Sequence, residues 1–191
     1  QPLHRDFALN DDVYRDIHKW DLCPSMIIDE SDGEISSLQR ALDLGYRGTS
    51  HKNCKGVFKG IANACKIQLN RQTKDGEWIL SGEDLANVGP VALLNDLTVM
   101  SSLGVNHVER NGHHYFAGLS VYPKDLQRKI CLAHPDLYSF GQLDFPSLVI
   151  NNGKIYLDSL TKSAFGCGLE LDEENIKKFG DSGMVPENWK S

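Results

Sequence analysis

Five side chains suited to proton transfer or metal binding each follow a short apolar segment of this chain. They are Asp29 and Glu30, His51 and Lys52, and Glu109. A carboxylate at the end of a rigid strand is a good ligand for a hard divalent cation. A lysine or histidine beside a second cation has a lowered pKa and can act as an acid or base. The pattern therefore predicts acid–base chemistry, with or without a metal.

Each of these residues also has a purely structural explanation. Asp29 could cap a helix or lie in a solvated loop, and His51 and Lys52 could be ordinary loop residues. Glu109 is followed by Arg110, so the two could form a surface ion pair. No single residue decides between the two explanations, but their joint placement after successive strands favours the chemical one.

The elements that must position these residues alternate between strand and helix. Apolar periodicity predicts strands over residues 25–29, 46–50, 77–81 and 105–109, and helices over 11–22, 33–45, 56–67 and 84–104. Gly45 lies where the second helix should stop, and Gly89-Pro90 either kinks the fourth helix or marks its true start.

Strands separated in this way by helices form parallel βαβ units. The carboxyl ends of parallel strands meet at one edge, and in a (β/α)8 barrel all of them contribute to one active-site mouth. Polar residues after four successive strands favour a barrel over an open sheet, whose ligands bind only at a switch point. We therefore predict an α/β fold with about four βα units, which is half of a (β/α)8 barrel. The segment "SGED" resembles a capping box, so Glu83 and Asp84 are expected to cap a helix.

The pattern changes after residue 110. A helix is predicted over residues 122–134, a β-hairpin over 147–159 with Asn152-Gly153 at its turn, and a surface tail beyond Ser163. The predicted organisation is a barrel half, residues 1–112, followed by an extension of helix, hairpin and tail, residues 113–191.

Composition limits the partners. The net charge of −6 argues against nucleic acid, whose phosphates require a basic surface. No apolar run approaches the roughly 20 residues of a membrane helix, so no membrane partner is expected. Five cysteines without a CxxC spacing fit neither a zinc site nor a disulfide framework, and indicate a cytoplasmic protein.

Four segments together carry a family resemblance. "IIDES", "SHKNCKG", "ILSGEDLANVGPVALL" and "GVNHVERNG" resemble the second half of the barrel in the enolase superfamily, in its mandelate racemase and muconate lactonizing branches. The resemblance covers residues 1 to 112. The first three residues, "QPL", resemble the end of the fourth barrel strand. The resemblance therefore implies the carboxy-terminal half of a barrel, in which one of three metal-binding carboxylates is present.

The resemblance also implies roles. Asp29 matches a Mg²⁺ ligand, and Glu30 matches an acidic neighbour that pairs with the lysine of the sixth strand. Lys52 is our first choice for the catalytic base and His51 the second, because "KG" replaces the family's glycine pair and leaves the spacing open. Glu109 matches an acid that faces the substrate. No histidine follows "WIL", so a racemase-type histidine base is not expected.

Members of this superfamily remove the proton α to a carboxylate and stabilise the resulting enediolate with Mg²⁺. The resemblance thus predicts a Mg²⁺-dependent lyase, an acid-sugar dehydratase acting on a small carboxylate, with racemisation and cycloisomerisation compatible with the same residues. Two alternatives stay open. One is an inactive half-barrel that pairs with a copy of itself or with the missing half. The other is an unrelated α/β module that binds a small molecule.

Overall fold

The structure is a computed structural model that describes residues 3–83, 87, 89–109 and 117–170. The chain divides into two compact units, one of residues 1–85 with 99–110 and one of residues 86–98 with 111–191. The predicted division instead placed all of residues 1–112 together. The difference lies in the helix at residues 91–102, whose two ends contribute to different cores. Each unit is described by itself below.

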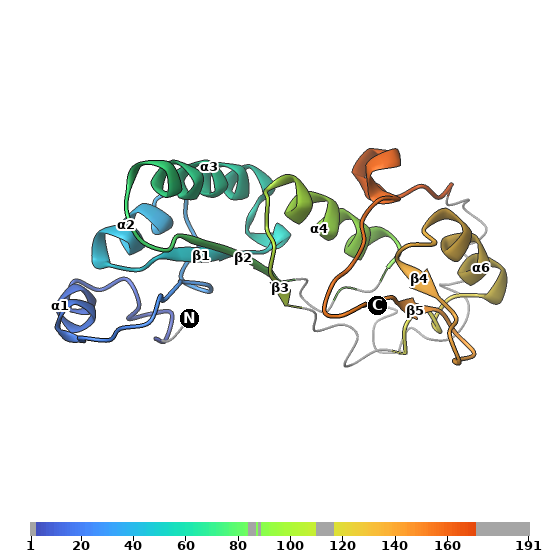
Figure 1. Ribbon diagram of the computed structural model, residues 1–191, viewed down its shortest axis with the longest axis horizontal. Coiled ribbons are helices and arrows are strands. Elements are labelled where there is room, and N and C mark those ends of the chain that lie inside the picture. The colour runs from blue at the N-terminus through green and yellow to red at the C-terminus, as the bar shows by residue number, and fades with distance from the viewer. Residues whose placement is uncertain (1–2, 84–86, 88, 110–116, 171–191) are drawn as a thin grey trace, which may run out of the picture. The chain divides into compact units, whose positions relative to one another are not determined.

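A small parallel sheet forms the centre of the first unit (Figure 1). Its strands are β1 (Gly48–His51), β2 (Ile79–Glu83) and β3 (Val108–Glu109), paired in sequence order. The predicted parallel pairing of these strands is confirmed. The predicted strand over residues 25–29 is reduced to a single parallel bridge between Ile28 and Thr49.

Helices α2 (Ser37–Leu44) and α3 (Val57–Thr73) cover one side of β1 and β2, as Figure 1 shows. Gly45 ends α2 with a φ of 103°, a left-handed conformation that favours glycine, as the sequence predicts. The other helices of this unit are α1 (Asp12–Lys19) and the 3₁₀ turn η1 (Asn53–Lys55). Helix α4 (Val91–Ser102) begins directly after Pro90, and only its end, from residue 99, belongs to this unit.

Two groups of buried side chains hold the helices against the sheet. Ile28 packs with Ala41 and Leu44 of α2. A second group combines side chains from α2, α3, β2 and the end of α4: Leu38, Ile67, Trp78, Leu80, Met100 and Val105. Burial of apolar area of this kind is the main favourable contribution to folding. It fixes the strands, and therefore the side chains at their ends.

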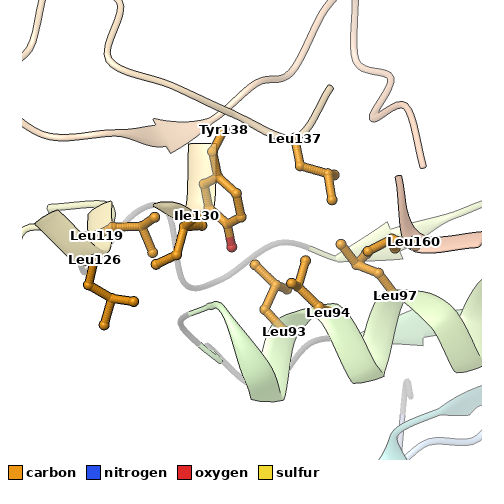
Figure 2. Packing of buried hydrophobic residues seen from close by; sticks show 9 residues of the cluster. All are labelled: Leu93, Leu94, Leu97, Leu119, Leu126, Ile130, Leu137, Tyr138 and Leu160. Carbon is orange, nitrogen blue, oxygen red and sulfur yellow. The ribbon is translucent and has the colours of Figure 1, made fainter. Parts of the chain in front are cut away.

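The second unit contains α6 (Lys124–Ala133), β4 (Tyr138–Ser139), β5 (Ser147–Leu148) and two 3₁₀ turns, η2 (Leu160–Lys162) and η3 (Ala164–Gly166). The predicted helix over 122–134 is confirmed. Figure 2 shows the core: three leucines from α4 face side chains from α6, β4, η2 and the segment before α6. The residues are Leu93, Leu94, Leu97, Leu119, Leu126, Ile130, Leu137, Tyr138 and Leu160.

The predicted hairpin over residues 147–159 is wrong in its pairing. Asn152 and Gly153 do form the turn, with φ of 50° and 72°, but only one bridge, between Asn151 and Lys154, flanks it. Ser147 and Leu148 instead pair antiparallel with β4. The turn residues fixed the local reversal, whereas the partner of the preceding strand depended on packing against the core.

The structure thus shows a mixed α/β protein with a three-stranded parallel sheet. The assignment to one half of a (β/α)8 barrel stays a prediction. No helix among the described residues is long and apolar enough to cross a membrane.

Candidate functional site

Lys52 lies between two carboxylates where the strands of the first unit end. Its Nζ donates to Asp29 Oδ2 at 2.9 Å and lies 2.8 Å from Glu83 Oε2. Asp29 directly follows the bridge at Ile28, Lys52 directly follows β1, and Glu83 ends β2. All three side chains are largely buried: Lys52 is 10% exposed, Asp29 15% and Glu83 18%. The parallel strands therefore bring together residues that are 23 or more positions apart.

A second lysine fixes Asp29 from the other side. Lys55, in the 3₁₀ turn η1, donates to Asp29 Oδ1 at 2.6 Å, to the Asp29 carbonyl at 2.7 Å and to the Ser50 carbonyl at 3.0 Å. An ammonium group has three N–H donors, and these contacts use all of them. Lys55 is thus a positioning residue that holds the Asp29 carboxylate in one orientation. We refer to Asp29, Lys52, Lys55 and Glu83 as the strand-end cluster.

The electrostatics of the cluster keep Lys52 and Asp29 charged. Burial acts to lower the pKa of Lys52, but the hydrogen bonds and charges of Glu83 and Asp29 raise it above the ordinary value of 10.5. Burial likewise acts to raise the pKa of Asp29, yet the contacts with Lys55 and Lys52 lower it below 3.8. The expectation of a lowered lysine pKa is therefore wrong here. Lys52 is an ammonium group, ready to donate a proton rather than to accept one.

His51 belongs to the opposite face of β1. Successive side chains of a strand point to opposite sides of the sheet. The His51 ring lies so close to Gly60 of α3 that a methyl group added at Gly60 would be 2.5 Å from His51 Cε1. The imidazole is buried, and its Nε2 lies 2.9 Å from Asn53 Oδ1. The structure thus brings Lys52 into the cluster and packs His51 against α3, because the two are neighbours in an extended strand.

The two remaining predicted acids lie at the edge of this arrangement. Glu30 is exposed, and the ion pairs of Lys52 go to Asp29 and Glu83 instead of to Glu30. That expected pairing is wrong, because the residue after Asp29 turns outward. Glu109 is exposed and stands in register with Glu83 on the neighbouring strand. Both side chains therefore lie on one face of the sheet, at the same end.

A second group of polar residues lies against α3. Asp32 Oδ1 accepts from Lys59 at 2.9 Å, while Oδ2 accepts from Thr49 at 2.8 Å and from Asn63 at 3.0 Å. Lys59 also donates to the Asp32 carbonyl. Asp32 is 2% exposed. We call Asp32, Thr49, Lys59 and Asn63 the helix-side cluster, and it ties the loop after Ile28 to α3.

The described residues do not fit a Mg²⁺ ion by themselves. Both carboxylate oxygens of Asp29 accept a lysine N–H, and no three His, Cys, Asp or Glu side chains converge among the described residues. Mg²⁺ requires near-octahedral oxygen ligands, and the two ammonium groups beside Asp29 repel any further cation. Asp29 supplies only one of the several ligands that Mg²⁺ requires.

Comparisons with known proteins add no family to this picture. No family model, no curated protein and no solved structure matches the chain. The assignment of function therefore depends on the geometry of the strand ends.

Sequence reasoning missed Lys55, Glu83 and Asp32. Lys52 and Lys55 are three residues apart, and residues at that spacing are eclipsed in a 3₁₀ turn, so this spacing was a usable signal. Glu83 was predicted as a helix cap, and its partner in that prediction, Asp84, lies outside the described residues, as do Arg110 and the first two residues of "QPL". The contact of Asp32 with α3 depends on tertiary packing and had no local signal.

Proposed function

We propose that this chain supplies the acid–base part of the active site of a lyase resembling those of the enolase superfamily. Its substrate is a small acid-sugar-like carboxylate that loses water after the proton α to the carboxylate is removed. The observation that supports this most is the buried Lys52 ammonium held between Asp29 and Glu83 at the carboxyl ends of parallel strands. Strand ends of this kind are where α/β enzymes place their chemistry.

The cluster suits a reaction that develops negative charge. Removal of an α proton leaves an enediolate, and a fixed ammonium group stabilises such a charge best in a site with little water. Two N–H groups of Lys52 go to Asp29 and Glu83, which leaves one without a protein acceptor among the described residues. We assign that N–H to an oxygen of the substrate.

The proton balance of the dehydration follows from the charge of Lys52. A base takes the proton from the α carbon, the bond between the β carbon and its hydroxyl oxygen breaks, and Lys52 gives its proton to the departing hydroxyl, which leaves as water. Lys52 itself becomes a base only when a ligand takes Asp29 or Glu83 away from it, since those carboxylates raise its pKa. Glu109, exposed beside Glu83, faces the same side of the sheet and is the described carboxylate best placed to meet a substrate.

Mg²⁺ stays part of the prediction that comes from the resemblance. No step above uses it, because the described residues supply only Asp29. We expect the purified chain to bind Mg²⁺ weakly or not at all in calorimetry, and tight stoichiometric binding would contradict this description of the site.

The sheet edges and the cysteines support two further parts of the proposal. Among the described residues, β3 and Ile28 are each paired on one side only, and open strand edges favour pairing with another chain. We propose that a second copy or a complementary half-barrel covers them. Light scattering that gives a monomer of 21.3 kDa would contradict this. All five cysteines are free, which fits a cytoplasmic location.

The decisive test separates charge from proton transfer at position 52. The protein, in the assembly in which it is isolated, is incubated with aldonic and aldaric acids in D₂O. Proton NMR follows loss of the α-proton signal, and the keto-acid product is trapped as a semicarbazone. We expect Lys52→Met and Lys52→Arg each to slow dehydration by about 10²- to 10⁴-fold, the usual contribution of a general acid. Lys52→Arg keeps the positive charge, so it is expected to retain more α-proton exchange than Lys52→Met. Unchanged dehydration in Lys52→Arg would remove the proton-donor role.

A further inference from the structure

The first unit has a hollow at the amino ends of its strands, opposite to the strand-end cluster. It has a volume of about 560 Å³ and lies beside Arg47, which directly precedes β1, and Trp78, which directly precedes β2. The size is within the range typical of small-molecule sites. Part of its wall is apolar and includes Ile17, Pro24 and Leu42.

Arg47 is held rigidly at this hollow. Its backbone N–H donates to the Met26 carbonyl at 2.7 Å, and its carbonyl accepts from the Ile79 N–H at 2.8 Å. The guanidinium carbon lies 5.0 Å from the centre of the Trp78 ring, a cation–π contact. On another side the guanidinium lies close to the backbone at Gly76, where an added methyl group would be 3.2 Å from Arg47 Nη1. The guanidinium is therefore confined between an aromatic ring and the backbone.

Trp78 is fixed in turn. Its indole N–H donates to the Lys74 carbonyl at 3.4 Å, its own carbonyl accepts from Arg71 Nε at 2.9 Å, and Lys74 Nζ lies 5.6 Å from the ring centre. The ring is buried. A buried, anchored ring beneath a guanidinium limits its motion, and a preorganised group loses less entropy when it binds a ligand.

Arg47 has no carboxylate partner within the described part of the chain. Glu77 also lines the hollow, is exposed, and forms no ion pair with Arg47. A guanidinium group is always charged and has a planar fork of donors that matches a carboxylate or phosphate. The hollow thus presents one fixed cation that forms no ion pair with a described residue.

We propose that this hollow binds a small monocarboxylate with a compact apolar body. Its carboxylate pairs with the Arg47 fork, and its body contacts the wall that contains Ile17, Pro24 and Leu42. A carboxylate is favoured over a phosphate because Glu77 adds a negative charge at the same hollow, and like charges repel a dianion more strongly than a monoanion. The site is independent of the function proposed for the strand ends, so either proposal can fail alone.

The test uses the full 191-residue chain labelled with ¹⁵N. Benzoate is the carboxylate probe, benzamide is its uncharged isostere, and inorganic phosphate is the competing oxyanion. Titrations follow the indole N–H signal of Trp78, and calorimetry gives the affinities. We expect benzoate to shift this signal to saturation, phosphate to bind more weakly and benzamide not to bind.

Two charge variants are expected to change the affinity for benzoate in opposite directions. Arg47→Gln should weaken benzoate binding by at least about tenfold, the cost of one charge-assisted hydrogen-bonded pair. Glu77→Gln should tighten it, and Asp125→Asn, an exposed change in the other unit, should leave it unchanged. The amide spectrum checks that each variant is folded, and Arg47→Lys, which keeps the charge, should lie between wild type and Arg47→Gln. Equal binding of benzoate and benzamide, no shift of the Trp78 signal, or full affinity in Arg47→Gln would overturn the proposal.

Discussion

The strand-end cluster and the helix-side cluster use the same kinds of residue for different purposes. In the helix-side cluster one carboxylate, Asp32, meets one ammonium and two neutral donors, and Asp32 is almost fully buried. In the strand-end cluster one ammonium, Lys52, meets two carboxylates whose side chains keep 15% and 18% exposure. The carboxylate of the first cluster is enclosed, whereas the carboxylates of the second stay partly open to solvent.

The difference teaches which buried charges to regard as functional. An ion pair whose carboxylate is almost fully buried contributes fixed geometry and is costly to break, but a ligand cannot reach that carboxylate. An ammonium group held between partly exposed carboxylates can meet a substrate. Two adjacent residues show the separation, because Lys52, directly after β1, lies in the strand-end cluster and His51, the last residue of β1, packs against α3.

The largest effect is expected for Asp32→Ala. The change leaves the buried Lys59 ammonium without its carboxylate and removes the acceptor of Thr49 and Asn63, so the free energy of unfolding should fall by about 3 to 5 kcal/mol. Urea denaturation followed by circular dichroism measures it. Asp43→Asn, an exposed change on α2, is the matched control and should stay within about 0.5 kcal/mol of wild type. Similar losses in both variants would erase the contrast between the clusters.

Asp29→Asn should have the opposite balance of effects, with a small loss of stability and a large loss of activity. Its partners Lys52 and Lys55 keep other acceptors in Glu83 and in the backbone carbonyls, so we expect a loss of only about 1 to 2 kcal/mol in the free energy of unfolding. The dehydration described above should nevertheless be abolished. Full turnover in Asp29→Asn would show that the strand-end cluster is as purely structural as the other one.

The pH dependence of stability sharpens the comparison further. The pKa of Lys52 is raised, so its contribution is complete below the unfolded value of about 10.5 and is lost as the pH rises through the higher folded value. The pKa of Asp29 is lowered, so its contribution is complete above about 3.8 and is lost as the pH falls below that. We expect wild type to lose stability above pH 10.5 more steeply than Lys52→Met. Parallel denaturation profiles of the two proteins in this range would contradict the ion-pair geometry.

The smallest effect on chemistry is expected for His51→Gln. The imidazole lies on the face covered by α3 and contacts Asn53, so the variant should lose about 1 kcal/mol in the free energy of unfolding. Its dehydration rate should equal that of wild type once both proteins are folded. A loss of rate comparable to that of Lys52→Met would move His51 into the site.

The sequence predicted the features that depend on local pattern. The alternation of apolar segments and helices located all three strands of the sheet and their order, and Gly45 marked the end of α2. Placement at strand ends identified Asp29 and Lys52, because parallel pairing forces those ends together.

What the sequence did not predict depends on packing. Glu83 fits a capping motif as well as an ion pair, and only the position of Lys52 at the end of the neighbouring strand β1 decides between them. The residue order "His-Lys" does not say which side chain faces α3, since a shift of one residue exchanges the two faces. The partner of β5 was likewise settled by its packing beside the core of the second unit and not by the Asn152-Gly153 turn.

Helix α4 has a consequence for hydrogen exchange. Leu93, Leu94 and Leu97 belong to the core of the second unit, whereas Met100, one turn later, belongs to a core of the first. Amide exchange reports the free energy of the cooperative unit that must open to expose each N–H. If the two units open with different free energies, a single twelve-residue helix will show two levels of protection, with the step between Leu97 and Met100.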